Sequence, residues 1–488
     1  MHHGAMTTGP TFGQARRGER VRAWTDKDKA KGDEASSDGV CMVQRPRGTR
    51  DFTASAMKRR LALEHLLEDV AVRHGFSRVQ TPVFESLELF TAKSGPGVIK
   101  QLYAFQDKGE RDLTLRPELT APVMRMVAEE LRNETKPLRL SYFGQCYRYE
   151  EFKTGRYREF FQYGVELIGA SGPLAEAEVI ALAVNMLTDV GLMDWEVRIG
   201  HVGVLKDALV GLGLSAEVDA TTGEPPVASA MRLLDKGDSS GLDALFVTNG
   251  LDPMHAQSLR ALAALEGGME TLGPARSILS TMDGVSLEAL DELELTLKAL
   301  GKLAKRPPKL AVDLTVARGL DYYTGMVFEV KVPAMGGEGQ VLGGGSYKLL
   351  HLFGLPDLDP CCGFGLGFDR VLLALEAQAN ATGRNEVVFG EVDPRPLVAV
   401  IPFKVDPLDV LSLVAELRTS GVRVELELRG RKVGKALGWA DSIGCTHAIV
   451  IGPNELEEKK GRIKNLSTGE QISTGLYPDD VLEALMER

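Results

Sequence analysis

The 488-residue sequence lacks the features of membrane, secreted and zinc-binding proteins. No run approaches the roughly 20 apolar residues that a membrane-spanning helix needs, and the N-terminus has no apolar core of the signal-peptide type. The five cysteines include no C-x-x-C pair, and their odd number suits reduced thiols rather than a disulfide framework. We therefore predict a cytoplasmic protein that makes no contact with a membrane.

Common metal-binding and nucleotide-binding motifs are also absent. The eight histidines form no H-E-x-x-H pattern, so we predict no metal site built by the protein. No P-loop is present, and no G-x-G-x-x-G follows a strand, which disfavours Walker-type ATPases and dinucleotide enzymes. Acidic residues outnumber basic ones by 68 to 57, so any contact with nucleic acid must use local basic patches.

What remains is the composition of an ordinary globular protein, and the length suggests about three domains. The small, polar residues 1–41 predict a disordered leader. Helix and strand patterns mix over 42–192 and 306–392, where we expect one domain. The alanine- and leucine-rich stretch 193–305 predicts a helical insertion. Alternating strands and helices over 395–488 predict a small α/β domain with a parallel sheet.

Polar side chains lie along two predicted strands, 137–150 and 159–170. Because strand side chains alternate between faces, Gln162 and Glu166 share one face of the second strand. Further polar groups come from three other segments: Arg116, Glu118 and Thr120; Arg318, Asp321, Tyr322 and Tyr323; and Arg370 behind a glycine run. Any one of them could equally face water. Together they predict a site for an anionic, polyphosphate-like ligand and a small polar ligand, because an inert core would not tolerate so many unpaired groups.

Five segments of the chain resemble the histidyl-tRNA synthetases (histidine–tRNA ligases), a class II aminoacyl-tRNA synthetase family. GFSRVQTPVFE, YRYEEFKTGRYREF and GFGLGFDR resemble the three class II motifs, while LRPELTAP and ARGLDYYTGMVFE resemble the two histidine-recognition segments. Ser346 and Lys348 stand where many members have Arg and Asp, which suggests an archaeal-type variant. The resemblance covers 42–488 and implies an α/β protein. It would contain an α+β catalytic domain with a mainly antiparallel sheet, a helical insertion and an anticodon-binding domain.

The resemblance also implies an activity, partners and residue roles. The chain would activate L-histidine with ATP to histidyl-adenylate, with Mg²⁺ bound to the ATP, and transfer histidine to the 3′ end of tRNA(His) as a homodimer. The implied catalytic residues are Arg148 and Arg318. The implied histidine-binding residues are Glu118, Leu119, Thr120, Arg148, Gln162, Glu166, Arg318, Tyr322 and Tyr323. The implied ATP-binding residues are Arg148, Glu150, Arg156 and Arg370.

A basic cluster in the C-terminal domain is the expected tRNA-facing patch. It consists of Arg429, Arg431, Lys432 and Lys435, at the opening of a predicted helix. A solvated helix face is the alternative for these residues. Two alternatives to the enzyme remain for the whole chain: the regulatory subunit of ATP phosphoribosyltransferase, which keeps the fold without charging tRNA, and an RNA-sensing or scaffold module.

Overall fold

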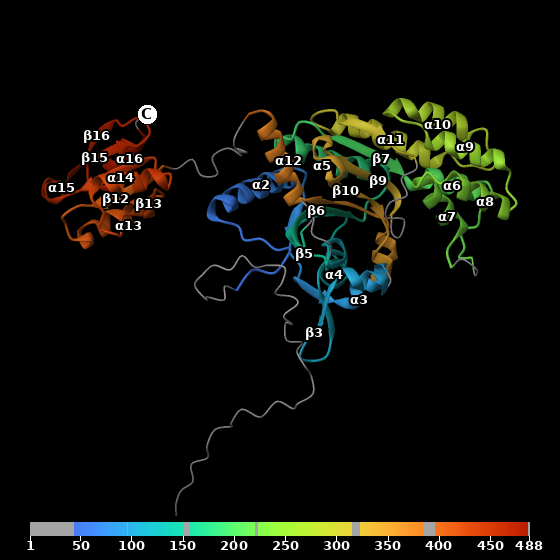
Figure 1. Cartoon of the computed structure of the whole chain (residues 1–488), viewed down its shortest axis with the longest axis horizontal. Helices are drawn as coiled ribbons and strands as arrows, with labels where there is room; N and C mark the ends of the chain where they lie inside the picture. Colours follow the sequence, from blue (N-terminus) through green and yellow to red (C-terminus); the bar gives the residue numbers. More distant parts are fainter. Residues whose placement is uncertain are drawn as a thin grey trace, which may run out of the picture. The chain divides into compact units, whose positions relative to one another are not determined.

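The structure is a computed structural model that describes residues 43–94, 96–149, 157–219, 223–314, 323–383 and 396–486 (Figure 1). The predicted leader 1–41 lies outside the described residues. So do five of the predicted site residues, namely Glu150, Arg156, Arg318, Asp321 and Tyr322. The chain divides into two units, Met1–Thr49 and Arg50–Arg488, and the elements described below belong to the second.

Eight strands form the main sheet, in the order β1-β5-β6-β11-β10-β9-β7-β8. Their bounds are β1 Ser77–Val79, β5 Leu138–Tyr147, β6 Glu159–Ile168, β7 Glu196–His201, β8 Lys309–Val312, β9 Tyr323–Lys331, β10 Gln340–Tyr347 and β11 Cys361–Gly367. Only the outermost pairs, β1 with β5 and β7 with β8, are parallel. The predicted mainly antiparallel sheet is therefore confirmed.

Both faces of this sheet are covered by helices, as Figure 1 shows. Helices α2 (Ala54–Arg73), α5 (Pro173–Asp189) and α12 (Phe368–Ala381) lie on one face, and α4 (Thr120–Glu130) lies on the other. Tyr163, Val165 and Leu167 of β6 enter the core under α5, because alternate residues of a strand share a face. Leu140 and Tyr142 of β5 enter the core beside α4.

A small three-stranded sheet lies beside α4. It contains β2 (Phe84–Ser86), β4 (Asp112–Leu115) and β3 (Tyr103–Gln106), in that order, with α3 (Leu87–Ser94) and the short helix η1 (Pro96–Gln101) between β2 and β3. Strand β4 leads directly into the segment that carries Glu118 and Thr120. This sheet therefore delivers those two side chains to the start of α4.

The predicted helical insertion 193–305 begins too early, because this span contributes strand β7 to the main sheet. Val197 and Ile199 of β7 are fully buried, and the strand pairs with β8 and β9. A strand of six residues beside a long helix-rich stretch leaves only a weak pattern in the sequence. The helices of the span are α6 Val202–Gly211, α7 Pro226–Asp235, α8 Ser239–Thr248, α9 Pro253–Ala263, α10 Leu272–Leu279 and α11 Glu288–Leu303. The division into domains otherwise stays a prediction.

The C-terminal residues form a five-stranded sheet in the order β13-β12-β14-β15-β16. Its strands are β12 Leu397–Pro402, β13 Arg423–Leu426, β14 His447–Ile451, β15 Lys460–Asn465 and β16 Gln471–Gly475, and its helices are α13 Leu411–Thr419, α14 Val433–Ser442, α15 Pro453–Glu458 and α16 Pro478–Met486. The first three strands in chain order are parallel, but the hairpin β15–β16 is antiparallel. The predicted parallel sheet is therefore a mixed one.

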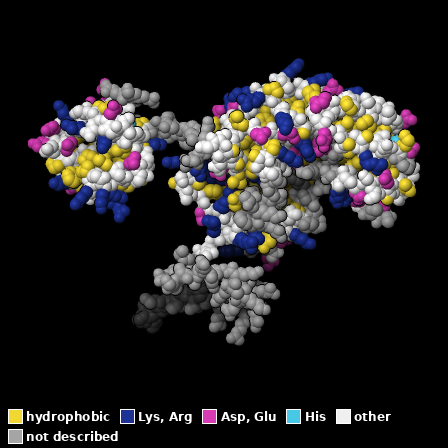
Figure 2. Space-filling model, turned by 45° about the horizontal axis from the view of Figure 1, so that its top comes forward, with side chains coloured by type: hydrophobic (Ala, Val, Ile, Leu, Met, Phe, Trp, Pro, Cys, Tyr) yellow, Lys and Arg dark blue, Asp and Glu magenta, His cyan; other side chains and the backbone are white. Residues whose placement is uncertain are grey.

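Surface charge and hydropathy agree with the composition. Figure 2 shows Lys and Arg side chains interspersed with Asp and Glu on the face in view, without one continuous positive field. Among the described residues, no helix combines the length and the apolar character needed to cross a bilayer.

Candidate active site

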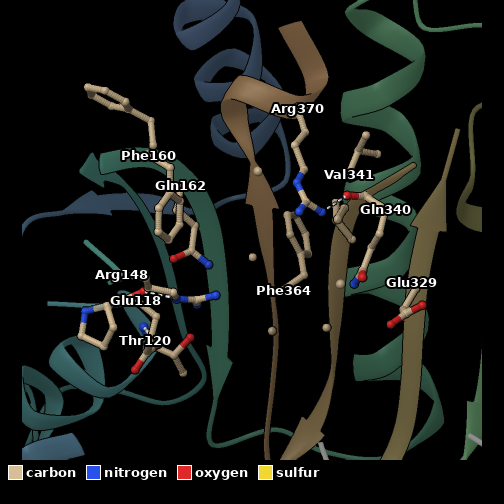
Figure 3. Close-up of a pocket in the computed structure, with 18 of the residues that line it drawn as sticks. Glu118, Thr120, Arg148, Phe160, Gln162, Glu329, Gln340, Val341, Phe364 and Arg370 are labelled. Atoms are coloured by element: carbon tan, nitrogen blue, oxygen red, sulfur yellow. Dashed lines mark hydrogen bonds between the residues drawn. The ribbon is translucent and has the colours of Figure 1, made fainter. Parts of the chain in front are cut away.

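A cavity of about 650 Å³ opens over the middle of the main sheet (Figure 3). Seven of the predicted site residues line it: Glu118, Thr120, Arg148, Gln162, Glu166, Tyr323 and Arg370. They come from segments between residues 118 and 370, so the tertiary fold brings them together. The side chain of Leu119 does not line the cavity. It is buried in the core with Val123 and Tyr142.

Glycines on β10 and β11 form the floor of the cavity. An added Cβ atom at Gly363 would overlap the carboxylate of Glu166, and one at Gly365 would overlap the amide of Gln162. Gly344 lies so close to the backbone of Gly363 that it too admits no side chain. The floor is therefore bare backbone, which a ligand can approach closely.

Glu166 is the centre of a buried polar cluster at one end of the cavity. Tyr142 Oη donates a hydrogen bond of 3.0 Å to Glu166 Oε1, and Tyr347 Oη donates to Glu166 Oε2. Thr120 Oγ1 lies 3.3 Å from Tyr142 Oη. Burial raises the pKa of Glu166 to about 7, against the hydrogen bonds from Tyr347, Thr120 and Tyr142, which lower it. A carboxyl group in this state can accept or hold a proton near neutral pH.

Tyr142 and Tyr347 were not among the predicted site residues. A signal for Tyr142 existed in the sequence, because Tyr142 has the same parity as Arg148 and would share its face in the predicted strand 137–150, although β5 ends at Tyr147. Tyr347 follows Ser346, in the segment that departs from the family pattern.

The start of α4 supplies a second set of polar groups. The carboxylate of Glu118 accepts hydrogen bonds from the backbone N–H groups of Thr120, at 2.6 Å, and of Ala121, at 3.1 Å. Arg148 Nε donates to the carbonyl oxygen of Pro117, at 3.0 Å, and its guanidinium carbon lies 5.2 Å from the centre of the Phe160 ring. Figure 3 shows Arg148, Glu118 and Thr120 side by side, with Gln162 above them. These contacts hold a cation and a carboxylate in fixed positions at the cavity wall.

Arg116 does not take part in the cavity, contrary to the prediction that it would converge with Glu118 and Thr120. It is buried, and its Nη1 atom donates to the carbonyl oxygens of Thr81, at 2.8 Å, and Pro82, at 3.0 Å. Strand β4 ends at Leu115, so the period of two on which the prediction relied does not continue. Arg116 instead ties backbone segments together.

The opposite side of the cavity carries Arg370, Gln340 and Glu329 (Figure 3). Arg370 stands in the first turn of α12, and its Nη1 atom donates a 2.7 Å hydrogen bond to the carbonyl oxygen of Gln340. Glu329 of β9, which was not predicted, has a largely buried side chain 3.6 Å from Lys331 Nζ. In the described part of the chain, no group of three or more His, Cys, Asp and Glu side chains could hold a metal ion.

Comparisons with known proteins agree with this geometry. A family model described as "Histidyl-tRNA synthetase" matches residues 48–371, and one described as "Anticodon binding domain" matches residues 397–488. The chain belongs to the histidyl-tRNA synthetase family. It is 41% identical to a histidine–tRNA ligase of Archaeoglobus fulgidus over 430 residues, which cover 88% of this chain and 97% of that protein. The archaeal character that the sequence suggested is therefore confirmed.

Two further relatives match about nine-tenths of the chain. A histidine–tRNA ligase of Methanocaldococcus jannaschii is 39% identical over 90% of this chain and 98% of its own length. The crystal structure of apo S. aureus histidyl-tRNA synthetase superposes with a TM-score of 0.65 and 28% identity, and covers 91% of this chain and 100% of that one. The cavity lies inside the region that the synthetase model matches.

The predicted tRNA-facing patch lies in the turn between β13 and α14 and, with Lys435, in the first turn of α14, inside the matched anticodon-binding region. Buried Glu427 accepts hydrogen bonds from the backbone N–H groups of Arg429, at 3.0 Å, and Arg431, at 3.1 Å. It also pairs with Arg431 Nη1, at 2.5 Å. The Arg431 guanidinium lies 5.0 Å from the centre of the Trp439 ring, while Lys435 is exposed. The turn is thus held rigidly at its base and presents basic groups outward.

Proposed function

We propose that this chain is a histidine–tRNA ligase, which forms histidyl-adenylate from L-histidine and ATP and then esterifies the 3′ end of tRNA(His). The observation that carries the proposal is the composition of one cavity. A buried carboxyl group flanked by two tyrosines lies at one end, and two guanidinium groups face the remainder. The carboxyl group with its two tyrosines suits a ligand side chain that has one hydrogen-bond donor and one acceptor. The two guanidinium groups suit a polyphosphate.

The Glu166 cluster would bind the imidazole ring of histidine. A neutral imidazole has one N–H donor and one lone-pair acceptor, and a carboxylate beside tyrosine hydroxyls can match both. The carboxylate of Glu118, with Thr120 and Gln162, would hold the α-amino group. A site built on such hydrogen bonds rejects amino acids that lack them by about 10⁴-fold or more. Tyr322 and Tyr323 keep their proposed places around this ligand, whereas Leu119, whose side chain is buried in the core, does not.

Arg148 would hold the histidine carboxylate and the α-phosphate together. One carboxylate oxygen then attacks the α-phosphorus, its new bond forms as the bond to pyrophosphate breaks, and negative charge builds on the phosphate oxygens. Pre-placed guanidinium groups stabilise that charge without reorganisation. Arg318 would assist at the α-phosphate, Glu150 would bind the adenine end, and Arg156 and Arg370 would bind the terminal phosphates.

Mg²⁺ would enter with the ATP and neutralise phosphate charge. The cavity offers the carboxylate of Glu329 on the side of Arg370, and Mg²⁺ prefers few carboxylate ligands together with phosphate oxygens and water. In the second step a ribose hydroxyl of the tRNA attacks the activated carbonyl carbon and AMP leaves. The patch at Arg429, Arg431, Lys432 and Lys435 would face the tRNA.

We also propose that the protein is cytoplasmic and a homodimer, as the resemblance to the family implies. The segment around Pro82, which resembles the first class II motif, would form the dimer contact. Curated relatives over nearly the whole chain are histidine–tRNA ligases, and nothing observed favours the regulatory subunit or a scaffold module. Sedimentation at micromolar concentration tests the dimer.

Histidine-dependent exchange of pyrophosphate into ATP tests the activity. The wild type should exchange with histidine and with no other amino acid, and Arg148→Ala should lose at least about 100-fold. Arg139→Ala is the matched control, because Arg139 lies on β5, the strand that leads to Arg148, and pairs with Glu178 outside the cavity. No exchange from folded wild-type protein would refute the proposal.

A further inference from the structure

Two arginines and one carboxylate form a cluster behind the wall of the cavity. Asp369 precedes Arg370 in the first turn of α12 and is only 4% exposed. Its Oδ1 atom pairs with Arg60 Nη1, at 2.6 Å, and with Arg50 Nη2, at 2.8 Å. Its Oδ2 atom accepts the backbone N–H of Phe161, at 2.9 Å. The carboxylate of Asp369 therefore pairs with two guanidinium groups and accepts a hydrogen bond from the backbone of β6.

Aromatic rings enclose both guanidinium groups. The Arg60 guanidinium carbon lies 4.0 Å from the centre of the Phe52 ring and 4.3 Å from that of Phe161. The Arg50 guanidinium carbon lies 3.5 Å from the centre of the Tyr157 ring. Such contacts hold a guanidinium group flat against a ring and partly compensate its charge. Tyr157, Phe161 and Asp369 also line the cavity, so the cluster forms its outer shell.

Among the described residues, the charges of this cluster do not balance. Two guanidinium groups face the single carboxylate of Asp369, and Arg50 Nε and Arg60 Nη2 are buried with no hydrogen-bond partner among the described residues. A buried cation without full compensation is costly, and a bound anion nearby lowers that cost. Arg370 follows Asp369 directly and lines the same cavity. The cluster is therefore placed to favour a polyanion on this side.

We propose that Arg50 is a positioning residue for ATP. Arg50 orients Tyr157 through the contact with its ring. It also orients Asp369 through the ion pair, and thereby Arg370, the next residue. Its charge adds positive potential to the side of the cavity that receives the terminal phosphates. The proposal rests on the function proposed above, since it assigns that side of the cavity to ATP. Arg60 is the buried structural member of the pair, with a 7% exposed side chain against 22% for Arg50.

Replacing Arg50 should weaken ATP binding and leave histidine binding unchanged. We expect Arg50→Ala to raise the dissociation constant and the KM for ATP about tenfold or more, and to change the KM for histidine less than about twofold. Arg50→Lys keeps the charge but loses the flat stack on Tyr157. Its affinity for ATP should therefore lie between that of the wild type and that of Arg50→Ala.

ATP binding is measured by calorimetry without histidine, and KM values by pyrophosphate exchange. Arg78→Ala is the matched control: Arg78 also pairs with carboxylates, Glu64 and Glu68, and lies 5.4 Å from a ring centre, that of Phe143, but none of these partners lines the cavity. This control should keep wild-type ATP affinity. Thermal unfolding of both variants separates misfolding from the proposed effect.

The outcomes separate this inference from the proposed function. Unchanged ATP affinity in Arg50→Ala, or equal shifts in the KM for ATP and for histidine, would overturn the role of Arg50. Absence of exchange in the wild type would overturn the function, while calorimetry would still test Arg50. If Arg50→Ala does not fold, Tyr157→Leu, compared with the ring-preserving Tyr157→Phe, tests the same contact. Only the leucine variant should lose ATP affinity.

Discussion

Replacing Glu166 with glutamine should change how the stability of the protein depends on pH. Glu166 is 1% exposed, and burial raises its pKa from 4.5 to about 7. The folded protein therefore holds this proton more tightly than the unfolded chain does. Because unfolding releases the proton, the free energy of unfolding falls as pH rises between about 4.5 and 7. Over the range from about pH 5 to about pH 8 the loss is roughly 2–3 kcal/mol, at about 1.4 kcal/mol per unit.

Urea unfolding of the wild type and of Glu166→Gln, at a series of pH values, measures this loss. Subtracting one profile from the other cancels the groups common to both proteins and leaves the titration of Glu166. Tyr347→Phe provides the matched control, since it removes only the hydroxyl that donates to Glu166. Loss of this donor raises the pKa further, so the fall in stability should shift to higher pH.

A flat difference between the wild type and Glu166→Gln would refute this reasoning. It would mean that the hydrogen bonds from Tyr142 and Tyr347 outweigh burial and keep the carboxyl group ionised throughout. An identical profile for Tyr347→Phe and the wild type would show that the Tyr347 hydroxyl does not act on the proton of Glu166.

Three further substitutions test separate parts of the molecule. Arg148→Lys should lower histidine-dependent exchange by about 100-fold, because an ammonium group cannot reproduce the guanidinium fork, and near-normal exchange would count against the assignment. Gly365→Ala should displace the Gln162 amide and raise the KM for histidine about tenfold, at a cost of about 1–3 kcal/mol in stability. Glu427→Gln should weaken tRNA binding several-fold in a filter assay, because Arg431 loses its ion pair. Pyrophosphate exchange should not change. Unchanged tRNA affinity would contradict a role of Glu427 in holding Arg431 toward the tRNA.

Local pattern was enough to predict part of the cavity lining. The alternation along 159–168 places Gln162 and Glu166 on one face, and both line the cavity in the structure. Gly363 and Gly365 were visible as a glycine run, and both lie on the cavity floor. Such features depend on neighbours within a few residues, so sequence reasoning reaches them.

Other features depend on contacts that no local pattern encodes. Arg116 resembles a site residue in the sequence, yet the backbone carbonyls of Thr81 and Pro82 occupy its guanidinium group. Strand β7 lies in a helix-rich stretch and becomes visible only through its pairing with β8 and β9. In each case the partner lies far away in the chain, and its position depends on the packing of the whole sheet.

The sequence by itself determined the family, the mainly antiparallel sheet and the cavity residues that recur with strand periodicity, because these depend on residue type and spacing. Only the tertiary structure decided which groups surround them. Tyr142 and Tyr347 meet at Glu166, and Arg60 reaches Asp369 across 309 residues of sequence. Burial and pairing set the charge state of a carboxyl group, and both are properties of the packed fold rather than of the chain.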